Sequence, residues 1–224
     1  MSETSEIFQS VVRARRSLRA FKPQAVDKAL LEKIFATAQW APSNCNTQPW
    51  KVHVASGDVL EKLRSELPAR FTNGDISMDF PYDGQYDGVY KDRQFGAAMA
   101  MYAAAGIARE DKPARHEQFM QNFTFFGAPH VAFLFLPEPF SLREAADLGM
   151  FAQTLMLTLT ANDLGSCPQT ALGFHANFVR EVLGAEESDK LVFGISFGYP
   201  EEDAAVNDCQ TDRAEGNAAV QFHN

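Results

Sequence analysis

Cysteine is scarce in the sequence and is not spaced to bind metal or form a disulfide scaffold. Cys45, Cys167 and Cys209 are an odd number and show no C-x-x-C spacing, so no disulfide or zinc site is expected. Such usage is typical of a reducing compartment. No run approaches the roughly 18 apolar residues that span a bilayer, and the N-terminus has no basic-then-apolar signal pattern. We expect a cytoplasmic protein with no metal and no membrane contact.

Positive charge is also in short supply. The 224 residues include 20 lysines and arginines against 29 acidic residues, which gives a net charge of -9. Long-range repulsion at this charge disfavours nonspecific binding to nucleic acid or to anionic membranes, although it is compatible with a local basic pocket. With 46% hydrophobic residues, the chain can bury one core of ordinary stability. We expect a single domain over residues 1–224.

Glycine-rich phosphate loops are missing, since neither a G-x-G-x-x-G nor a Walker pattern occurs. A bound nucleotide would therefore have to be held by side chains. The candidates are Arg15, Arg16, Ser17 and Arg19, which follow a segment of helical spacing at residues 5–14. Guanidinium groups match phosphate oxygens bidentately, so this cluster is either a phosphate clamp or an ordinary solvated face. The residues alone leave both interpretations open.

One short motif argues for a different chemistry. Residues 194–198 match the G-x-S-x-G pattern of serine hydrolases. That pattern must lead from a strand directly into a helix, whereas Tyr199 and Pro200 indicate a turn. A catalytic triad would also require an acid and His223 in the short tail, without a sheet strand to carry the acid. We therefore disfavour the hydrolase interpretation.

Residues 40–50 form the stretch around which we expect the rest of the chain to be organised. Two prolines and a row of amide and hydroxyl side chains separate a helical pattern from a strand pattern, so the backbone must form an irregular polar loop. Trp40 and Trp50 flank this loop. Such a mixture suits a flat, partly apolar ligand that forms hydrogen bonds. The alternative is an ordinary turn whose tryptophans anchor the core.

Hydrophobic periodicity and turn residues predict the regular elements. Helices are expected at residues 5–14, 27–38, 58–67, 93–108, 141–165 and 175–183, with Pro68 ending the third, close packing at Gly96 and Gly106 in the fourth, and Gly165 capping the fifth. Strands are expected at residues 51–55, 130–136 and 191–197, with the second at the centre of the sheet. Residues 109–121 are expected to be a polar connection, and residues 166–171 a second polar loop.

Two further segments lack a regular pattern. Residues 68–92 are turn-rich and aromatic, which argues against disorder and favours a pocket wall or lid; the alternative is a surface loop pinned by its aromatic side chains. Residues 201–224 cannot form a core of their own. We expect them to wrap another surface, such as that of a second copy.

In order and spacing, these motifs resemble the nitroreductase family of FMN-dependent oxidoreductases. The matching features are the arginine cluster at 15–19, the loop at 40–50, the Pro-Gln pair at 168–169, the Gly-Tyr-Pro turn at 198–200 and an arginine near the terminus. The resemblance covers most of the chain and is weakest between residues 65 and 121. Residues 90–93, 122–129 and 167–169 are most similar to the branch that acts on nitrobenzoates and similar nitroarenes.

The resemblance implies an α+β fold with a central, mostly antiparallel sheet flanked by helices. It also implies an intertwined homodimer with two FMN sites at the interface and a C-terminal extension, residues 201–224, that embraces the partner.

The resemblance also assigns roles to residues by position. Arg15 and Arg213 would hold the FMN phosphate. Arg16 and Ser17 would lie beside the phosphate and ribityl chain, and Arg19 would lie at the pyrimidine edge of the ring. Pro42, Ser43, Asn44 and Asn46 would come from the other subunit, and Gln48 would support that loop. Pro168, Gln169 and Thr170 would line one face of the ring, and the backbone N–H of Ala171 would approach N5. Gln210 departs from the branch, where an arginine is frequent, so phosphate binding would depend more on Arg213.

The implied reaction is a ping-pong transfer in which NADH or NADPH reduces FMN and a small aromatic acceptor then takes the electrons. The resemblance points to a nitro group of the nitrobenzoate or dinitroaniline type, reduced to a hydroxylamine. No protein catalytic residue is required because the cofactor carries the chemistry, while Arg19 would stabilise the negative charge of the reduced ring. The alternatives are a same-fold enzyme that acts on quinones, enones or halophenols or destroys flavin, and an FMN-binding protein without turnover.

Overall fold

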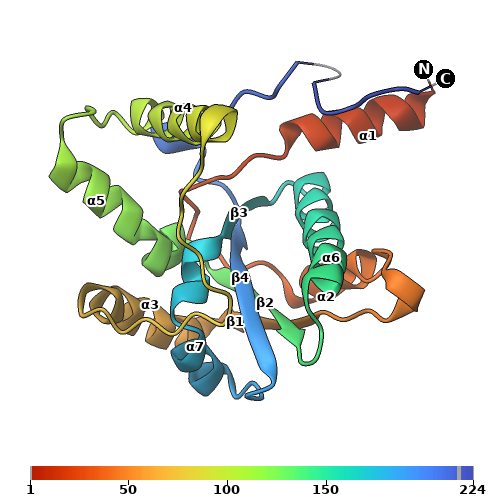
Figure 1. Ribbon diagram of the computed structural model, residues 1–224, viewed down its shortest axis with the longest axis horizontal. Helices are drawn as coiled ribbons and strands as arrows, with labels where there is room; N and C mark the ends of the chain where they lie inside the picture. The colour runs from red at the N-terminus through yellow and green to blue at the C-terminus, as the bar shows by residue number, and fades with distance from the viewer. Residues whose placement is uncertain (1, 216–217, 224) are drawn as a thin grey trace.

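The fold is built on one antiparallel sheet. The computed structural model describes residues 2–215 and 218–223. The strands of this part of the chain are β1 (Lys51–Ser56), β2 (His130–Pro137), β3 (Gly165–Gln169) and β4 (Asp189–Gly198), in the spatial order β1-β2-β4-β3 (Figure 1). Each neighbouring pair is antiparallel. The predicted α+β class with an antiparallel sheet is confirmed.

Helices surround the sheet. The α-helices within the described residues are α1 (Glu3–Ala14), α2 (Lys28–Ala38), α3 (Gly57–Thr72), α4 (Gly88–Ala104), α5 (Lys112–Met120), α6 (Leu142–Ala161) and α7 (Ala176–Leu183). Short 3-10 helices are η1 (Asn44–Asn46), η2 (Gln121–Gly127), η3 (Thr170–Phe174) and η4 (Ala205–Asp208). The helices predicted near residues 5–14, 27–38 and 175–183 are thus confirmed as α1, α2 and α7.

Strand β2 lies inside the sheet, as the sequence predicts. It pairs with β1 on one side and with β4 on the other. One hydrophobic core covers Phe133 and Phe135 with α3, α7 and η2, and the other covers Ala132 and Leu134 with α2 and α6. Because both faces of β2 are buried, its nearly continuous apolar run is stable there.

Strand β1 departs from its predicted pattern. The sequence predicts one buried face carrying Val52 and Val54, but Val52 is half-buried and Val54 is 40% exposed. Ala55, on the opposite face, is fully buried. As an edge strand, β1 has a neighbour on one side only, so its faces are less completely covered than those of β2.

Helix α3 is longer than the sequence predicts. The predicted stop at Pro68 is wrong, because the helix continues to Thr72 with the proline inside it. A proline in a helix interior costs about 3 kcal/mol, since it lacks the N–H donor. Phe71 offsets that cost: its ring lies 4.6 Å from that of Phe123 between centroids and packs against the core. Tertiary packing therefore overrides the local stop signal.

The region between residues 73 and 121 contains more helix than predicted. Helix α4 begins and ends earlier than the predicted segment at 93–108. Helix α5 occupies the predicted polar connection, and its N-cap Asp111 accepts a hydrogen bond from the N–H of Ala114 at 3.0 Å. The irregular aromatic segment is therefore shortened to residues 73–87.

The close packing predicted at Gly96 and Gly106 is wrong. No heavy atom lies within 4 Å of the place where a Cβ would stand on either residue. Helix α4 has no buried residue, so no neighbouring element approaches it closely enough to require glycine. Gly106 instead lies just beyond the end of the helix with a left-handed φ of +68°, a conformation that glycine adopts at little cost.

The predicted second polar loop at residues 166–171 is, for most of its length, strand β3. Pro168 has no N–H to donate, and an edge strand tolerates it because the sheet continues on one side only. Gly165 belongs to this strand rather than to the cap of α6, whose C-cap is Asn162. A Cβ on Gly165 would lie 2.5 Å from Cδ1 of Leu18 and 3.2 Å from Cε1 of Phe21, so a larger residue here would displace the side chain of Leu18.

Helix α6 begins as predicted and ends sooner. Ser141 and Glu144 form the capping box, with the backbone N–H of Ser141 donating to Oε2 of Glu144 at 3.1 Å. The helix is 20 residues long. Phe151, a buried residue of α6, stacks on Trp50 with the ring centroids 5.1 Å apart. One of the two loop tryptophans therefore does anchor the core.

Apolar side chains remain uncovered on the first helix. Helices α1 and α4 contain no buried residue, and Figure 1 shows both at the periphery. In α1, Ile7 and Phe8 are 58% and 60% exposed. No helix within residues 2–215 and 218–223 is both long and apolar enough to cross a membrane.

Candidate functional site

A cavity of about 400 Å³ gathers arginines from the two ends of the chain. Its lining consists of Val12, Arg13, Arg15, Arg16, Ser17, Arg19, Cys209, Gln210, Thr211 and Arg213. Five of these ten residues are arginines and none is acidic. The arginine cluster and the C-terminal arginine selected from the sequence therefore line a single cavity.

The arginine segment is extended because it leaves helix α1 and joins the edge of the sheet. Arg15 is the C-cap of α1 and has extended backbone angles. Ser17 forms a parallel bridge with Ser166 of β3, and the N–H of Leu18 donates to the carbonyl of Ser166 at 3.0 Å. Consecutive side chains of an extended segment point to opposite sides, so Leu18 enters the core while Ser17 and Arg19 line the cavity.

Asn207 ties this segment to the C-terminal part of the chain. Its side-chain oxygen accepts hydrogen bonds from the N–H groups of Arg19 at 2.7 Å and Ala20 at 3.1 Å. Its side-chain nitrogen donates to the carbonyls of Ala20 and Glu201, each at 2.9 Å. Its backbone carbonyl accepts from Nε of Arg16 at 3.0 Å. One residue, 4% exposed, thus fixes the backbone from which the arginines project.

The cavity is strongly electropositive. Burial lowers the pKa of Arg15, and the neighbouring charge of Arg213 lowers it further. Among the described residues, no ion pair to a carboxylate involves any of the five arginines of the lining. Within the described part of the chain, Arg213 donates to oxygens of Thr211 and Asp212 in its own turn. Cations held this close without a counter-ion favour the binding of an anion such as a phosphate.

The buried thiol of Cys167, which feels the charges of Arg15 and Arg19, is not activated. Burial raises the pKa of Cys167 to about 11, although the charges of Arg19 and Arg15 act in the opposite direction. The thiol is therefore protonated near neutral pH, and a thiol is a poor nucleophile. The arginines of the cavity can bind and orient an anion, and Cys167 adds no reactive thiolate beside them.

The end of β3 and the turn after it bring two of the four selected residues to the surface. Pro168 and Thr170 are exposed, and Ala171 is 8% exposed. Gln169 differs, because its side chain is buried: its nitrogen donates to the carbonyl of Asn122 at 2.9 Å and its oxygen accepts from the hydroxyl of Ser196. The side-chain amide of Gln169 therefore supports the turn from inside the fold and is not free for a ligand.

The loop at residues 42–48 is shaped but does not line this cavity. Cys45, Asn46 and Gln48 have left-handed backbone angles, which are costly for residues other than glycine and mark a constrained loop. The N–H of Asn44 donates to Oδ2 of buried Asp147 at 3.1 Å.

Ser43 holds the other end of the loop, with its hydroxyl accepting from the N–H of Gln48 at 2.9 Å. Pro42, Asn44, Asn46 and Gln48 are exposed, and Ser43 is half-buried. Within one chain these residues are thus largely exposed, and none of them belongs to the lining of the arginine cavity.

Sequence reasoning missed several residues of the site. Asn207 carries no local signal, because an isolated asparagine in a polar tail has many ordinary roles. Val12, Arg13, Cys209 and Thr211 line the cavity only because the tail returns to the end of α1. Gln210 also lines it, at the position where the sequence departs from the expected arginine.

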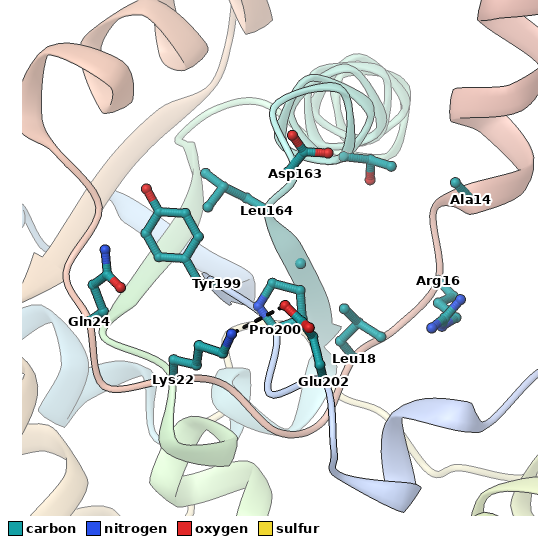
Figure 2. A pocket seen from close by; sticks show the side chains of 12 residues that line it. Ala14, Arg16, Leu18, Lys22, Gln24, Asp163, Leu164, Tyr199, Pro200 and Glu202 are labelled. Atoms are coloured by element: carbon teal, nitrogen blue, oxygen red, sulfur yellow. Dashed lines mark hydrogen bonds and ion pairs between the residues drawn. The ribbon is translucent and has the colours of Figure 1, made fainter.

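A larger cavity of about 530 Å³ borders the same segment: it shares Arg16 with the arginine cavity and is also lined by Leu18 (Figure 2). Figure 2 shows Lys22 paired with Glu202, 3.2 Å apart, on one side of this cavity. Asp163 adds a second carboxylate to the lining. This mixed charge suits an anion less well than the arginine cavity does, so the candidate site is the smaller cavity.

Comparison with known proteins agrees with the geometry. The sequence matches the family model described as the nitroreductase family over residues 12–199. It is 40% identical to nitroreductase NfnB of Mycolicibacterium smegmatis (strain ATCC 700084 / mc(2)155), over 98% of this chain and 94% of the relative. It is 32% identical to a 4-nitrobenzoate reductase of Pseudomonas putida, over 99% of this chain and 98% of the relative. The fold matches the crystal structure of the FMN-dependent nitroreductase NfnB from Mycobacterium smegmatis in complex with NADPH, with a TM-score of 0.93, 39% identity, and coverage of 99% of this chain and 100% of that one.

Proposed function

The chain belongs to the nitroreductase family, and we propose that it uses FMN and NAD(P)H to reduce aromatic nitro groups to hydroxylamines. The observation that carries this proposal is the arginine cavity, which joins Arg15 and Arg213 from opposite ends of the chain without a carboxylate in its lining. A mononucleotide supplies the dianionic phosphate that such a cavity lacks.

The residues of the cavity fit the phosphate end of FMN. Arg15 and Arg213 would hold the phosphate oxygens, and Arg16 and Ser17 would lie beside the phosphate and ribityl chain. Arg19 would provide positive charge at the pyrimidine edge of the ring. The requirement for several arginines follows from the absence of a glycine-rich loop that could supply backbone N–H donors instead.

The turn after β3 fits the ring. Pro168 and Thr170 are exposed beside the arginine segment and would border one face of the ring, with the N–H of Ala171 toward N5. Gln169 would contribute through its backbone, because its amide is bonded to Asn122 and Ser196. When bound, FMN supplies the hydride chemistry, and the chain provides binding, orientation and positive charge.

The overall conversion consumes two molecules of NAD(P)H and two protons for each nitro group and releases one hydroxylamine, one water and two molecules of NAD(P)+. Arg19 would stabilise the negative charge that builds up at the ring edge during the first half of this exchange. The buried thiol of Cys167 is not an activated nucleophile, because burial raises its pKa to about 11. The role of the chain is to hold two planar reactants in succession at the same place.

We also propose that the working form is a homodimer of single-domain subunits. The loop at 42–48 turns its amides outward, where they would complete the ring site of a second copy, and the apolar residues Ile7 and Phe8 of α1 would be covered by it. The extension at 201–224 would wrap the partner beyond η4; residues 216, 217 and 224 lie outside the described residues. A cytoplasmic location is consistent with the need for NAD(P)H.

Anaerobic spectroscopy tests the proposal directly. Purified protein should show flavin absorption after FMN is added, bleach when NADH or NADPH is supplied, and recover its colour when a nitroarene is introduced. Failure to bind FMN would overturn every part of the proposal. Bleaching without recovery on any nitroarene, but with recovery on quinones, enones or halophenols, would assign the chain to another reaction of the same fold.

A further inference from the structure

A separate cavity of about 220 Å³ adjoins the turn that carries Thr170. One wall comes from the irregular segment between α3 and α4, through Met78, Phe80, Pro81 and Tyr82; the other comes from η3, through Thr170 and Phe174, and from β4. An apolar cavity of about 150 Å³ is large enough for benzene. The volume therefore fits one aromatic ring with a substituent.

The wall formed by residues 77–79 is fastened to the body of the protein. Ser77 donates its N–H to the carbonyl of Phe174 at 2.8 Å, and its hydroxyl accepts from the N–H of Asn177 at 3.1 Å. Two residues later, Oδ2 of Asp79 accepts from the N–H of Leu191 at 2.7 Å. The cavity is thus a built feature rather than the space under a loose loop.

An ion pair completes this attachment. The carboxylate of Asp79 pairs with the guanidinium of Arg180, and the two side chains are 10% and 9% exposed. Arg180 also donates to the carbonyl of Asp189 at 3.1 Å and to the side-chain oxygen of Asn177 at 2.6 Å. The negative charge of Asp79 is therefore matched behind the wall and does not act on the cavity as a free charge.

The charge of the cavity differs sharply from that of the arginine cavity. Its lining contains no charged residue. An adjoining cavity of about 410 Å³ shares Met78, Pro81 and Tyr82 with it and adds the carboxylate of Asp83. A carboxylated ring that entered would lose its hydration, meet no cation and approach an acidic residue. An uncharged ring would meet mostly aromatic and aliphatic neighbours, and the hydroxyls of Thr170 and Tyr82 add polarity without charge.

We propose that this cavity receives the aromatic ring of the electron acceptor and selects uncharged rings over benzoates. The inference rests on the proposed function, because Thr170 borders both this cavity and the expected ring face of FMN. The uncharged lining distinguishes between the two acceptor types that the sequence suggests. An uncharged nitroarene such as a dinitroaniline fits the cavity, and a nitrobenzoate does not. Asp79 acts as a positioning residue that holds the wall.

Binding measurements test the selection without turnover. Calorimetry on the oxidised holoenzyme, with no NAD(P)H present, would compare benzoate with methyl benzoate, which share a ring and differ in charge. The ester should bind at least about tenfold more tightly, because an unpaired carboxylate is costly in an apolar cavity. Equal affinity, tighter binding of benzoate, or no binding of either compound would overturn the inference.

A new positive charge should reverse the preference. Met78→Lys should bring benzoate to an affinity equal to or higher than that of the ester, whereas Met78→Gln should not. Val59→Lys, on the exposed face of α3, is the matched surface control and should leave the ratio unchanged. Tyr82→Lys repeats the test at a 46% exposed position that tolerates a polar side chain, should Met78→Lys fold poorly. An unchanged ratio in folded Lys variants would place the ring elsewhere.

Kinetics separate this inference from the proposed function. The ratio of kcat/KM for methyl 4-nitrobenzoate to that for 4-nitrobenzoate should exceed about ten in the wild type and fall in the Lys variants. Reduction of both acceptors with the same ratio in every variant would refute the cavity and leave the nitroreductase activity intact. Selective binding of the ester without reduction of any nitroarene would refute the activity and leave the cavity assigned to an uncharged ring.

Discussion

The side-chain oxygen of Asn207 accepts the backbone N–H of Arg19 at 2.7 Å, across 188 positions of sequence. The same buried amide makes three more hydrogen bonds, all to backbone groups, and the carbonyl of Asn207 accepts from Arg16. The carbonyls of Ala20 and Glu201 also accept from backbone N–H groups, whereas the N–H groups of Arg19 and Ala20 depend on the amide of Asn207 for their acceptor. The arginine cavity therefore depends on a residue that need not touch the ligand.

Asn207→Ala should weaken FMN binding although every arginine is retained. Leaving the N–H groups of Arg19 and Ala20 without an acceptor costs about 1–3 kcal/mol each, part of which would be relieved by movement of the arginine segment. We expect the Kd for FMN to rise at least about tenfold and the apoprotein to unfold at lower denaturant concentration.

Fluorescence titration with FMN and urea unfolding would measure these two effects. Asn73→Ala, at the exposed C-terminus of α3, is the control and should change neither. Asn207→Asp retains the acceptor and loses the donors, so it should fall between the wild type and Asn207→Ala. Wild-type affinity for FMN in Asn207→Ala would show that the arginine segment keeps its shape without this anchor.

The sequence predicts elements that carry their own periodicity and misses those stabilised by distant contacts. The apolar run of β2 and the capping box of α6 are local signals, and both are confirmed. The continuation of α3 past Pro68 depends on Phe71 meeting Phe123, a contact between residues far apart in the chain. No local pattern contains that information.

The candidate site shows the same division. The arginines can be predicted as phosphate ligands from the sequence, because a guanidinium group suits phosphate in any structural context. Arg15 and Arg213 do line one cavity. Gln169 was selected by position, but the structure turns its amide inward to Asn122 and Ser196. Side-chain direction depends on the packing of the whole fold, which residue types alone do not specify.

The two terminal arginines should contribute comparably to FMN affinity. Arg15→Ala or Arg213→Ala should each weaken FMN binding by about 1–3 kcal/mol through loss of charge-assisted hydrogen bonds to the phosphate. Riboflavin, which lacks the phosphate, should bind the wild type and both variants equally. Arg143→Ala, at an exposed position on α6, provides a control for loss of one positive charge. FMN titrations that are unchanged in both site variants would refute the phosphate assignment.

Breaking the Asp79–Arg180 pair should destabilise the protein more than removing it entirely. Asp79→Asn leaves the guanidinium of Arg180, in a side chain that is 9% exposed, without its carboxylate. Loss of one partner of a buried pair costs about 3–5 kcal/mol, whereas replacement of both by neutral groups is often much less harmful. We expect Asp79→Asn to lower the urea midpoint strongly and Asp79→Asn with Arg180→Gln to recover much of that loss.

The exposed carboxylate of Asp83 lies on the same segment and provides the control, since Asp83→Asn should leave the midpoint unchanged. The same series tests the positioning role of Asp79. The double variant should bind FMN normally and show a raised KM for the acceptor, because the wall of the cavity is released while the arginine cavity is untouched. Equal urea midpoints for the single and double variants would show that the interaction between Asp79 and Arg180 does not contribute to the free energy of unfolding.

Mild acid should destabilise the fold through its buried histidines. Burial lowers the pKa of both His130 and His175. Nε2 of His130 accepts the N–H of Val26 at 2.9 Å, which requires the neutral ring. As pH falls below about 6.5, the unfolded chain takes up protons that the folded chain does not, so the free energy of unfolding decreases until the folded pKa is reached. Each histidine contributes a slope of at most about 1.4 kcal/mol per pH unit in that window.

Urea unfolding at a series of pH values between about 7.5 and 5 should show this decrease in the free energy of unfolding. In His130→Gln, where the side-chain oxygen can accept from Val26, the slope should be shallower. The exposed His116 is the control, and His116→Gln should keep the wild-type slope. A wild-type slope in His130→Gln would mean that other groups carry the acid sensitivity.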